Sequence, residues 1–164
     1  MGLQLPGELV TALGWIGYTW PEADEEKLFE MGQAWLTFSG TVATAAGQAG
    51  SAAAAVWSQH SGESVQAFQK WWTDAESGPG TLPDYAQAAV LVGTGLIICA
   101  AIVLALKIAV IVQLAILAFE VAQAIATAVA TFGASLAEIP IFQMITREIV
   151  GLLIDQVLTE LMDA

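Results

Sequence analysis

The sequence predicts an all-α protein: a long antiparallel helical hairpin packed with further long apolar helices. Its 164 residues are rich in Ala, Leu, Ile and Val, and Ala and Leu lead the helix propensity scale, whereas the turn residues that separate strands are sparse. Apolar side chains recur at alternating steps of four and three between Met31 and Val56, which is the period of a packed helix. The chain is long enough for one domain with a core, or for a hairpin followed by a second helical layer.

The first 21 residues form an aromatic-rich lead, in which we expect a short helix over Glu8–Leu13 followed by a turn. Thr19 and Glu22 have the spacing of a capping box, and Pro21 suits a first helical turn. The acidic residues that follow match the positive end of the helix dipole. The first long helix is therefore expected to begin near Pro21.

A heptad seam runs along this long helix as far as Trp57. Its members are Met31, Trp35, Phe38, Val42, Ala45, Ala49, Ala52 and Val56. The first half is bulky and the second half is almost all alanine, so a packed helix can approach more closely at the far end. We predict that Trp35, Phe38, Val42, Ala45 and Ala49 form a seam for a partner helix.

The predicted hairpin turns at Ser58–Gly62, with Ser61 as the N-cap of a second helix that carries Val65, Phe68 and Trp72. A cluster of Gly and Pro then marks residues 78–85 as a linker. The expected organisation is a lead and hairpin over residues 1–77, this linker, and an apolar helical region over residues 86–164 that ends in an amphipathic helix from Pro140.

The segment 86–137 contains only two charged residues, Lys107 and Glu120. Its apolar residues occupy all faces, so it must be buried in protein or in lipid. No Gly or Pro near Lys107 provides a turn between two membrane spans, and basic flanks are absent. We favour burial against the hairpin or another chain, with membrane contact through 86–137 as the alternative.

Each of these two charges must reach solvent, a polar partner on another helix, or the edge of a membrane. If the segment is buried in protein and the charge of Lys107 has an exit to solvent, Lys107→Leu is expected to be tolerated or only modestly destabilising.

Charge and residue types exclude several classes of function. A net charge of −12 disfavours DNA and RNA as partners because phosphates would repel it. His60 is the only histidine and Cys99 lies in an apolar run, so no nucleophile and base pair, metal-ligand set or phosphate loop is indicated. We therefore expect a non-enzyme with no catalytic, metal or cofactor-binding residues. The N-terminus lacks the basic and apolar regions typical of a secretory signal peptide.

The segment from Val56 to Trp72 resembles the centre of the WXG100 superfamily: a Trp that closes a long helix, a Gly in the turn, then aromatic residues on the second helix. The stretches Leu-Gln-Leu-Pro-Gly-Glu-Leu and Thr-Trp-Pro-Glu-Ala-Asp-Glu-Glu-Lys-Leu are similar to the N-terminal domain of actinobacterial proteins related to the mycobacterial outer-membrane channel and toxin protein.

This resemblance implies an export and interaction module of a type VII secretion substrate, the N-terminal carrier of a toxin-like effector. Trp57 and Gly62 would form the turn, and Trp72 and Glu76 the export signal on the second helix. The implied partners are the secretion ATPase and a small helical WXG100-like protein or a second copy of the chain. The location would be secreted or cell envelope, without a cleavable signal peptide; a membrane channel or pore-forming domain is the alternative function.

Overall fold

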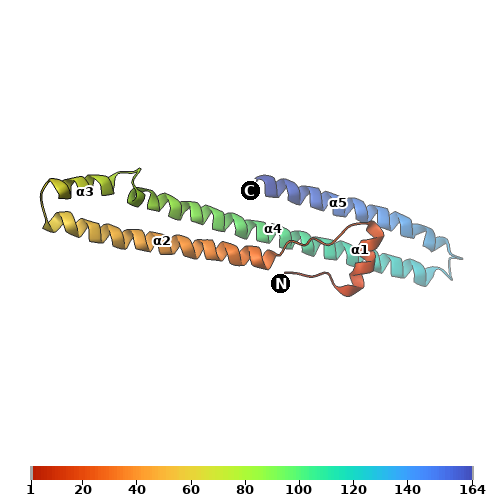
Figure 1. The fold of residues 1–164 in the computed structure, drawn as a ribbon. Coiled ribbons are helices and arrows are strands. Elements are labelled where there is room, and N and C mark those ends of the chain that lie inside the picture. The colour runs from red at the N-terminus through yellow and green to blue at the C-terminus, as the bar shows by residue number, and fades with distance from the viewer. Residues whose placement is uncertain (1, 164) are drawn as a thin grey trace. The chain divides into compact units, whose positions relative to one another are not determined.

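The computed structural model describes residues 2–163, and within that range every regular element is helical (Figure 1). The prediction of an all-α fold is confirmed. The elements in chain order are η1 (Gly7–Leu9), α1 (Val10–Ile16), α2 (Glu25–Gln59), α3 (Glu63–Thr73), α4 (Gly78–Thr127), η2 (Ala134–Glu138) and α5 (Ile139–Asp163).

Contacts divide the chain into two compact units at boundaries other than the expected ones. One unit is Phe29–Ile97, and the other combines the residues up to Leu28 with those from Ile98 onward. Residues 78–85, expected to be a linker, form the first turns of α4, with Pro83 inside the helix. Proline at the second helical position, Pro79, costs little because the first four N–H groups have no partner within the helix. The break in the chain instead lies just before them, at Asp74–Ser77.

The unit Phe29–Ile97 is a hairpin in which α2 runs antiparallel to α3 and the first part of α4 (Figure 1). A Cβ atom added to Gly32 would lie 2.7 Å from the carbonyl oxygen of Gly93, so the two backbones approach very closely there. Further along, the buried hydroxyl of Ser39 donates a hydrogen bond of 2.7 Å to the carbonyl oxygen of Ala86. Small side chains make this close approach possible.

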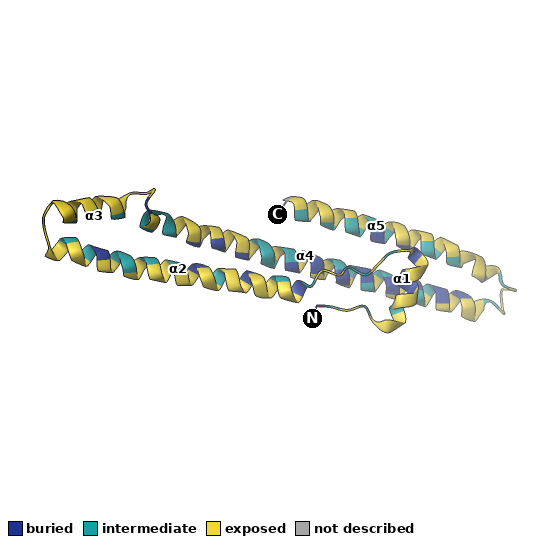
Figure 2. Cartoon of the chain, in the orientation of Figure 1, coloured by how far each residue is buried: buried dark blue, intermediate teal, exposed yellow. Residues whose placement is uncertain are grey.

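The buried face of α2 lies one position after the predicted seam. Gly32, Ser39 and Ala53 are buried, whereas Met31, Trp35 and Phe38 are exposed (Figure 2). One residue corresponds to a rotation of about 100° around a helix, so the seam is not what joins α2 to α4 within the chain. The heptad rule selected the bulkier side chains, while the closest contact uses the smaller ones.

Both predicted helix starts differ from the observed ones. The helix α2 begins at Glu25 rather than near Pro21, and its cap is Asp24, whose Oδ1 accepts the Lys27 N–H at 3.1 Å. This hydrogen bond lowers the pKa of Asp24. The start of α3 has Gly62 as N-cap, with no side-chain hydrogen bond, so the predicted Ser61 cap is wrong.

The second unit is built around large apolar side chains. Its core contains residues from α1, α4 and α5, namely Ala12, Leu13, Ile16, Val110, Leu114, Leu117, Val121 and Val150. The chain turns after Thr127, and α5 returns antiparallel to the second half of α4 (Figure 1). The predicted absence of a turn near Lys107 is confirmed, because α4 passes through that residue without a break.

Lys107 is buried in this unit, with 1% of its surface exposed. Its Nζ donates hydrogen bonds to the carbonyl oxygen of Ala23 at 2.6 Å and to Oε2 of Glu25 at 2.7 Å. The Nζ also lies 5.9 Å from the centroid of the Trp20 ring. The expected solvent exit is therefore wrong, and the alternative of a polar partner outside its own helix holds.

Glu25 completes the site from the start of α2. Its carboxylate also accepts a hydrogen bond from the backbone N–H of Leu3. Burial alone would raise the pKa of Glu25, but the hydrogen bonds from Lys107 and Leu3 outweigh it and lower the pKa to about 2. A buried ion pair thus joins the start of α2 to α4, and the hydrogen bond from Leu3 ties the lead segment to the same carboxylate.

Candidate interaction surfaces

The hairpin turn carries an aromatic cluster. Gly62 has φ +131°, a backbone conformation that glycine adopts without strain. Beyond Gly62, the centroid of the Phe68 ring lies 5.9 Å from that of the Trp57 ring and 5.7 Å from that of the Trp72 ring. The structure therefore brings Trp57 and Trp72, two of the predicted signal residues, together through Phe68. The adjacent Trp71 is 53% exposed and lies 6.3 Å from Phe68.

Glu76 does not share a helix with Trp72. The helix α3 ends at Thr73, and Glu76 lies in the turn before α4, where its N–H donates to Oδ1 of Asp74 at 2.9 Å. Ser77 caps the next helix, because its hydroxyl oxygen accepts the Gly80 N–H at 3.1 Å. Glu76 was expected to lie one helical turn after Trp72 on the same helix, and it is instead an exposed acid in a hydrogen-bonded turn.

The exposed side of α2 forms a second candidate surface. Met31, Ala34, Trp35 and Phe38 line an open depression of about 300 Å³. The Trp35 and Phe38 rings stack edge to face, with centroids 5.8 Å apart. In the rest of the predicted seam Ala45 is exposed, and Val42 and Ala49 are half-buried. The use of this seam by a partner stays a prediction, and its bulky end is uncovered within the unit.

Sequence reasoning missed the side of α2 that carries the close approach at Gly32. Gly32, Ser39, Ala46 and Ala53 are small residues at intervals of seven. That spacing places them on one face of α2. Their regularity was a usable signal, but it was hidden by the adjacent series of larger apolar residues.

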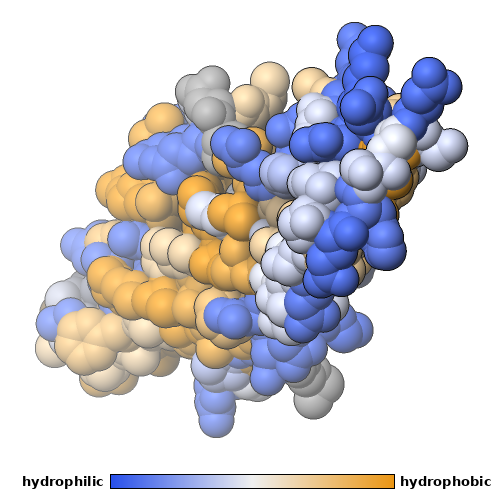
Figure 3. Space-filling view, turned by 90° about the vertical axis from the view of Figure 1, so that its left-hand side faces the viewer, coloured by the Kyte–Doolittle hydropathy of each residue, from blue (hydrophilic) through white to orange (hydrophobic). Residues whose placement is uncertain are grey.

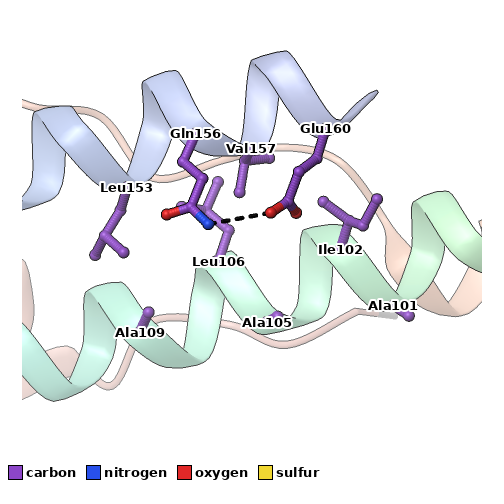
Figure 4. A pocket seen from close by; sticks show the side chains of 9 residues that line it. All are labelled: Ala101, Ile102, Ala105, Leu106, Ala109, Leu153, Gln156, Val157 and Glu160. Atoms are coloured by element: carbon purple, nitrogen blue, oxygen red, sulfur yellow. Dashed lines mark hydrogen bonds between the residues drawn. The ribbon is translucent and has the colours of Figure 1, made fainter. Parts of the chain in front are cut away.

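A third surface lies between α4 and α5. A groove of about 450 Å³ is lined by alanines and larger apolar residues of α4 and by the last turns of α5. In Figure 4, Gln156 and Glu160 project from α5 over this groove, and the Gln156 Nε2 donates to Oε1 of Glu160 at 3.1 Å. The groove is an amphipathic surface.

Much of the apolar segment is uncovered by its own chain. Among the described residues, one helical stretch within Glu63–Thr127 is long and apolar enough to cross a membrane, and 28% of its most apolar window is buried. Figure 3 shows hydrophobic residues reaching the surface beside hydrophilic ones. The expected burial of segment 86–137 is therefore only partly provided within the chain.

The described residues hold no group of three or more His, Cys, Asp or Glu side chains that could bind a metal ion. His60 is exposed at the hairpin turn, and Cys99 is half-buried on α4. The absence of a catalytic residue remains an expectation from the sequence.

Comparison with known proteins gives one family. A family model described as a WXG100 like domain matches residues 4–148. Neither a curated protein nor a solved structure matches the chain.

Proposed function

Because the chain belongs to the WXG100-like family, whose helical proteins are related to type VII secretion, we propose that it is a non-enzymatic export and interaction module. In this proposal it is the N-terminal carrier of a toxin-like effector, recognised by the secretion ATPase and released to the cell envelope or the exterior. Family members typically form oligomers of helical hairpins, which supports a helical partner.

The observation that carries the proposal is the exposed aromatic face of α2. Met31, Trp35 and Phe38 stand on one side of the long helix and Phe38 is 51% exposed. Covering one such side chain completely is worth about 1.5–3 kcal/mol. A helix of a small WXG100-like protein, or of a second copy, would bury these residues and continue along Ala45 and Ala49.

The proposed export signal is the aromatic cluster at the turn together with the acid that follows it. Trp57 and Trp72 are held by Phe68, so an aromatic anchor is presented in a fixed position. Glu76 adds an exposed negative charge in the turn after α3. A rigid anchor beside a charge suits recognition by another protein, since little side-chain entropy is lost on binding.

Export in a host with a type VII system tests the signal. We expect Trp72→Ala and Glu76→Ala to abolish the appearance of the protein in culture filtrate without loss of helix content. Trp15→Ala is the control, because it removes an exposed indole of the other unit, outside the aromatic cluster, and it should be exported. Normal export of both signal variants would reject this assignment.

Co-purification with WXG100-like proteins of the same host tests the seam. Phe38→Ala should weaken the complex by about tenfold or more. Phe29→Ala is the control, because Phe29 is similarly exposed and lies about half a turn away around α2. Equal loss in the two variants would contradict a docking surface on the Phe38 side.

The second candidate function is a membrane channel, favoured by the limited burial of the apolar segment. Lys107 is buried and paired on a continuous α4, so its charge is not free to line a pore. We expect the pure protein to produce no stepwise conductance in planar bilayers at neutral pH. Reproducible channels with a selectivity altered by Lys107→Leu would promote the channel over the export module.

A further inference from the structure

The turn between α4 and α5 is largely exposed (Figure 2), and large apolar residues lie in it. Phe132 is 100% exposed and Val129 is 90% exposed. Ile125 on the last turns of α4 and Leu136 on η2 are exposed beside them. We refer to residues 121–137 as the apolar tip. None of these exposed side chains belongs to the core of the unit.

Charge is absent from the apolar tip and returns at both of its ends. No Asp, Glu, Lys or Arg lies between Glu120 and Glu138. Glu120 precedes the tip on α4, and Glu138 follows it at the end of η2. The two acids therefore delimit an uncharged end of the helical pair.

The polar groups of the turn bond largely to one another. The Ser135 hydroxyl donates a hydrogen bond of 2.7 Å to the carbonyl oxygen of Ala124. The Thr131 hydroxyl in turn donates a hydrogen bond of 3.0 Å to the Ser135 hydroxyl oxygen. The backbone N–H of Gly133 donates to the carbonyl oxygen of Ala128 at 2.7 Å. Internal pairing lowers the cost of moving a turn into less polar surroundings, since fewer groups lose hydrogen bonds to water.

Phe132 is strained as well as exposed. Its φ of +52° makes it the one non-glycine residue with positive φ among the described residues. A bulky side chain in this conformation costs free energy, and full exposure of a phenyl ring returns none of it. Packing within the unit explains neither the positive φ of Phe132 nor the full exposure of its ring.

We propose that the apolar tip inserts into one leaflet of a lipid bilayer, with Phe132 and Val129 leading and the two acids at the level of the headgroups. From Glu120 to Thr127 the helix advances about 10 Å at 1.5 Å per residue. That is far less than the roughly 30 Å of a hydrocarbon core, and it is close to the depth reached by interfacial segments. The tip therefore anchors without spanning.

The lipid expected carries no net charge. The tip has no Lys or Arg to attract anionic headgroups, and the chain carries a net charge of −12. Zwitterionic phosphatidylcholine should consequently be bound better than mixtures that contain phosphatidylserine. This preference separates insertion of the tip from electrostatic adsorption. The proposal is independent of the export signal and of the seam on α2.

Flotation with phosphatidylcholine vesicles tests the proposal. We expect the wild-type chain to float, and Phe132→Asp to lower the partition coefficient by about tenfold or more, because a charge replaces the leading ring. Leu91→Asp is the matched control, since Leu91 is an exposed apolar residue on α4 in the other unit, and it should float like the wild type. Equal flotation of wild type and Phe132→Asp, or none by the wild type, would overturn the proposal and leave the tip to a protein partner.

Phe132→Gly separates insertion from structure. Glycine relieves the positive φ, so the melting temperature should stay the same or rise while partitioning falls. If the variant instead lost stability along with binding, the ring would have a structural role and the proposal would fail.

Depth can be measured with an environment-sensitive fluorophore attached to Phe132→Cys or, as control, Leu91→Cys, both in the Cys99→Ser background. Brominated lipids should quench the label at position 132 several times more strongly than the label at position 91. Equal quenching would mean that the whole apolar helix enters the bilayer, and would overturn insertion limited to the tip.

Discussion

The two units of this chain bury different kinds of side chain. In the hairpin Phe29–Ile97 the backbones approach closely at Gly32 and Gly93, while its Trp and Phe side chains remain half-buried or exposed. The other unit buries Leu114, Leu117 and a lysine. In one case backbones approach and large residues are left for the surface; in the other, large residues separate the helices and fill the space. Apolar content alone therefore does not decide which residues are buried.

The buried ion pair is where the second unit should be easiest to break. We expect Lys107→Leu to lower the free energy of unfolding by about 3–5 kcal/mol, because the buried Glu25 carboxylate loses its partner. Urea denaturation followed by circular dichroism measures this.

Two controls qualify that result. Lys27→Leu, which breaks the exposed pair with Asp24 at 3.8 Å, should change the free energy of unfolding far less than Lys107→Leu, because solvent screens an exposed pair. The double variant Lys107→Leu with Glu25→Gln should recover much of the loss. A Lys107→Leu variant as stable as Lys27→Leu would contradict the described pair.

Acid should weaken the same unit through Glu25. Its pKa in the folded protein is about 2, below the value near 4.3 expected for an unfolded chain, so folding favours the ionised form. This contribution, up to about 3 kcal/mol, is complete above about pH 4.3 and is lost as the pH falls towards 2. The free energy of unfolding of the wild type should therefore converge on that of Glu25→Gln across this window; a constant difference would be inconsistent with the ion pair.

Overpacking should disturb the hairpin by a smaller amount. A Cβ at Gly32 would lie 2.6 Å from Cγ1 of Ile97 and 2.7 Å from the Gly93 carbonyl oxygen. Gly32→Ala must push the helices apart, and we expect a loss of about 1–3 kcal/mol, measured by thermal denaturation. An unchanged melting temperature would show that the helices are not in such close contact.

The smallest effect has the opposite sign. Gly40 lies on α2 with open space around its Cβ position, so Gly40→Ala only restricts the unfolded chain and improves helix propensity. We expect a gain of about 0.5–1 kcal/mol. Destabilisation by this variant would place an unseen contact on the outer side of α2 and would sharpen the comparison with Gly32.

Local sequence signals were reliable where a helix depends on its own residues. The turn at Gly62 and the unbroken passage of α4 through Lys107 were predictable, because both depend on neighbours along the chain. The linker prediction at 78–85 was wrong, since Gly and Pro near a helix start do not prevent the helix. The break at Asp74–Ser77 depends instead on hydrogen bonds made by Asp74 and Ser77.

The candidate surfaces divide in the same way. The aromatic residues around the turn were recognisable from the resemblance to the WXG100 superfamily, and the structure joins Trp57 to Trp72 through Phe68. The side of α2 that packs internally was not recognisable from the sequence. Two series of residues one position apart, one of large apolar residues and one of small residues, both satisfy a heptad period. Which series faces α4 is decided by how closely the backbones approach at Gly32 and Gly93.

The sequence by itself determined that this protein is helical, that its first long helix turns back near Gly62, and that its second half is too apolar to be covered by one stripe. Periodicity and helix propensity are properties of neighbouring residues, so they can be read along the chain. Only the tertiary structure decided that Lys107 pairs with Glu25, and that Trp35 and Phe38 stay outside. Those outcomes depend on residues tens of positions apart meeting in space, and a desolvated charge or an uncovered ring is defined only once the helices have packed.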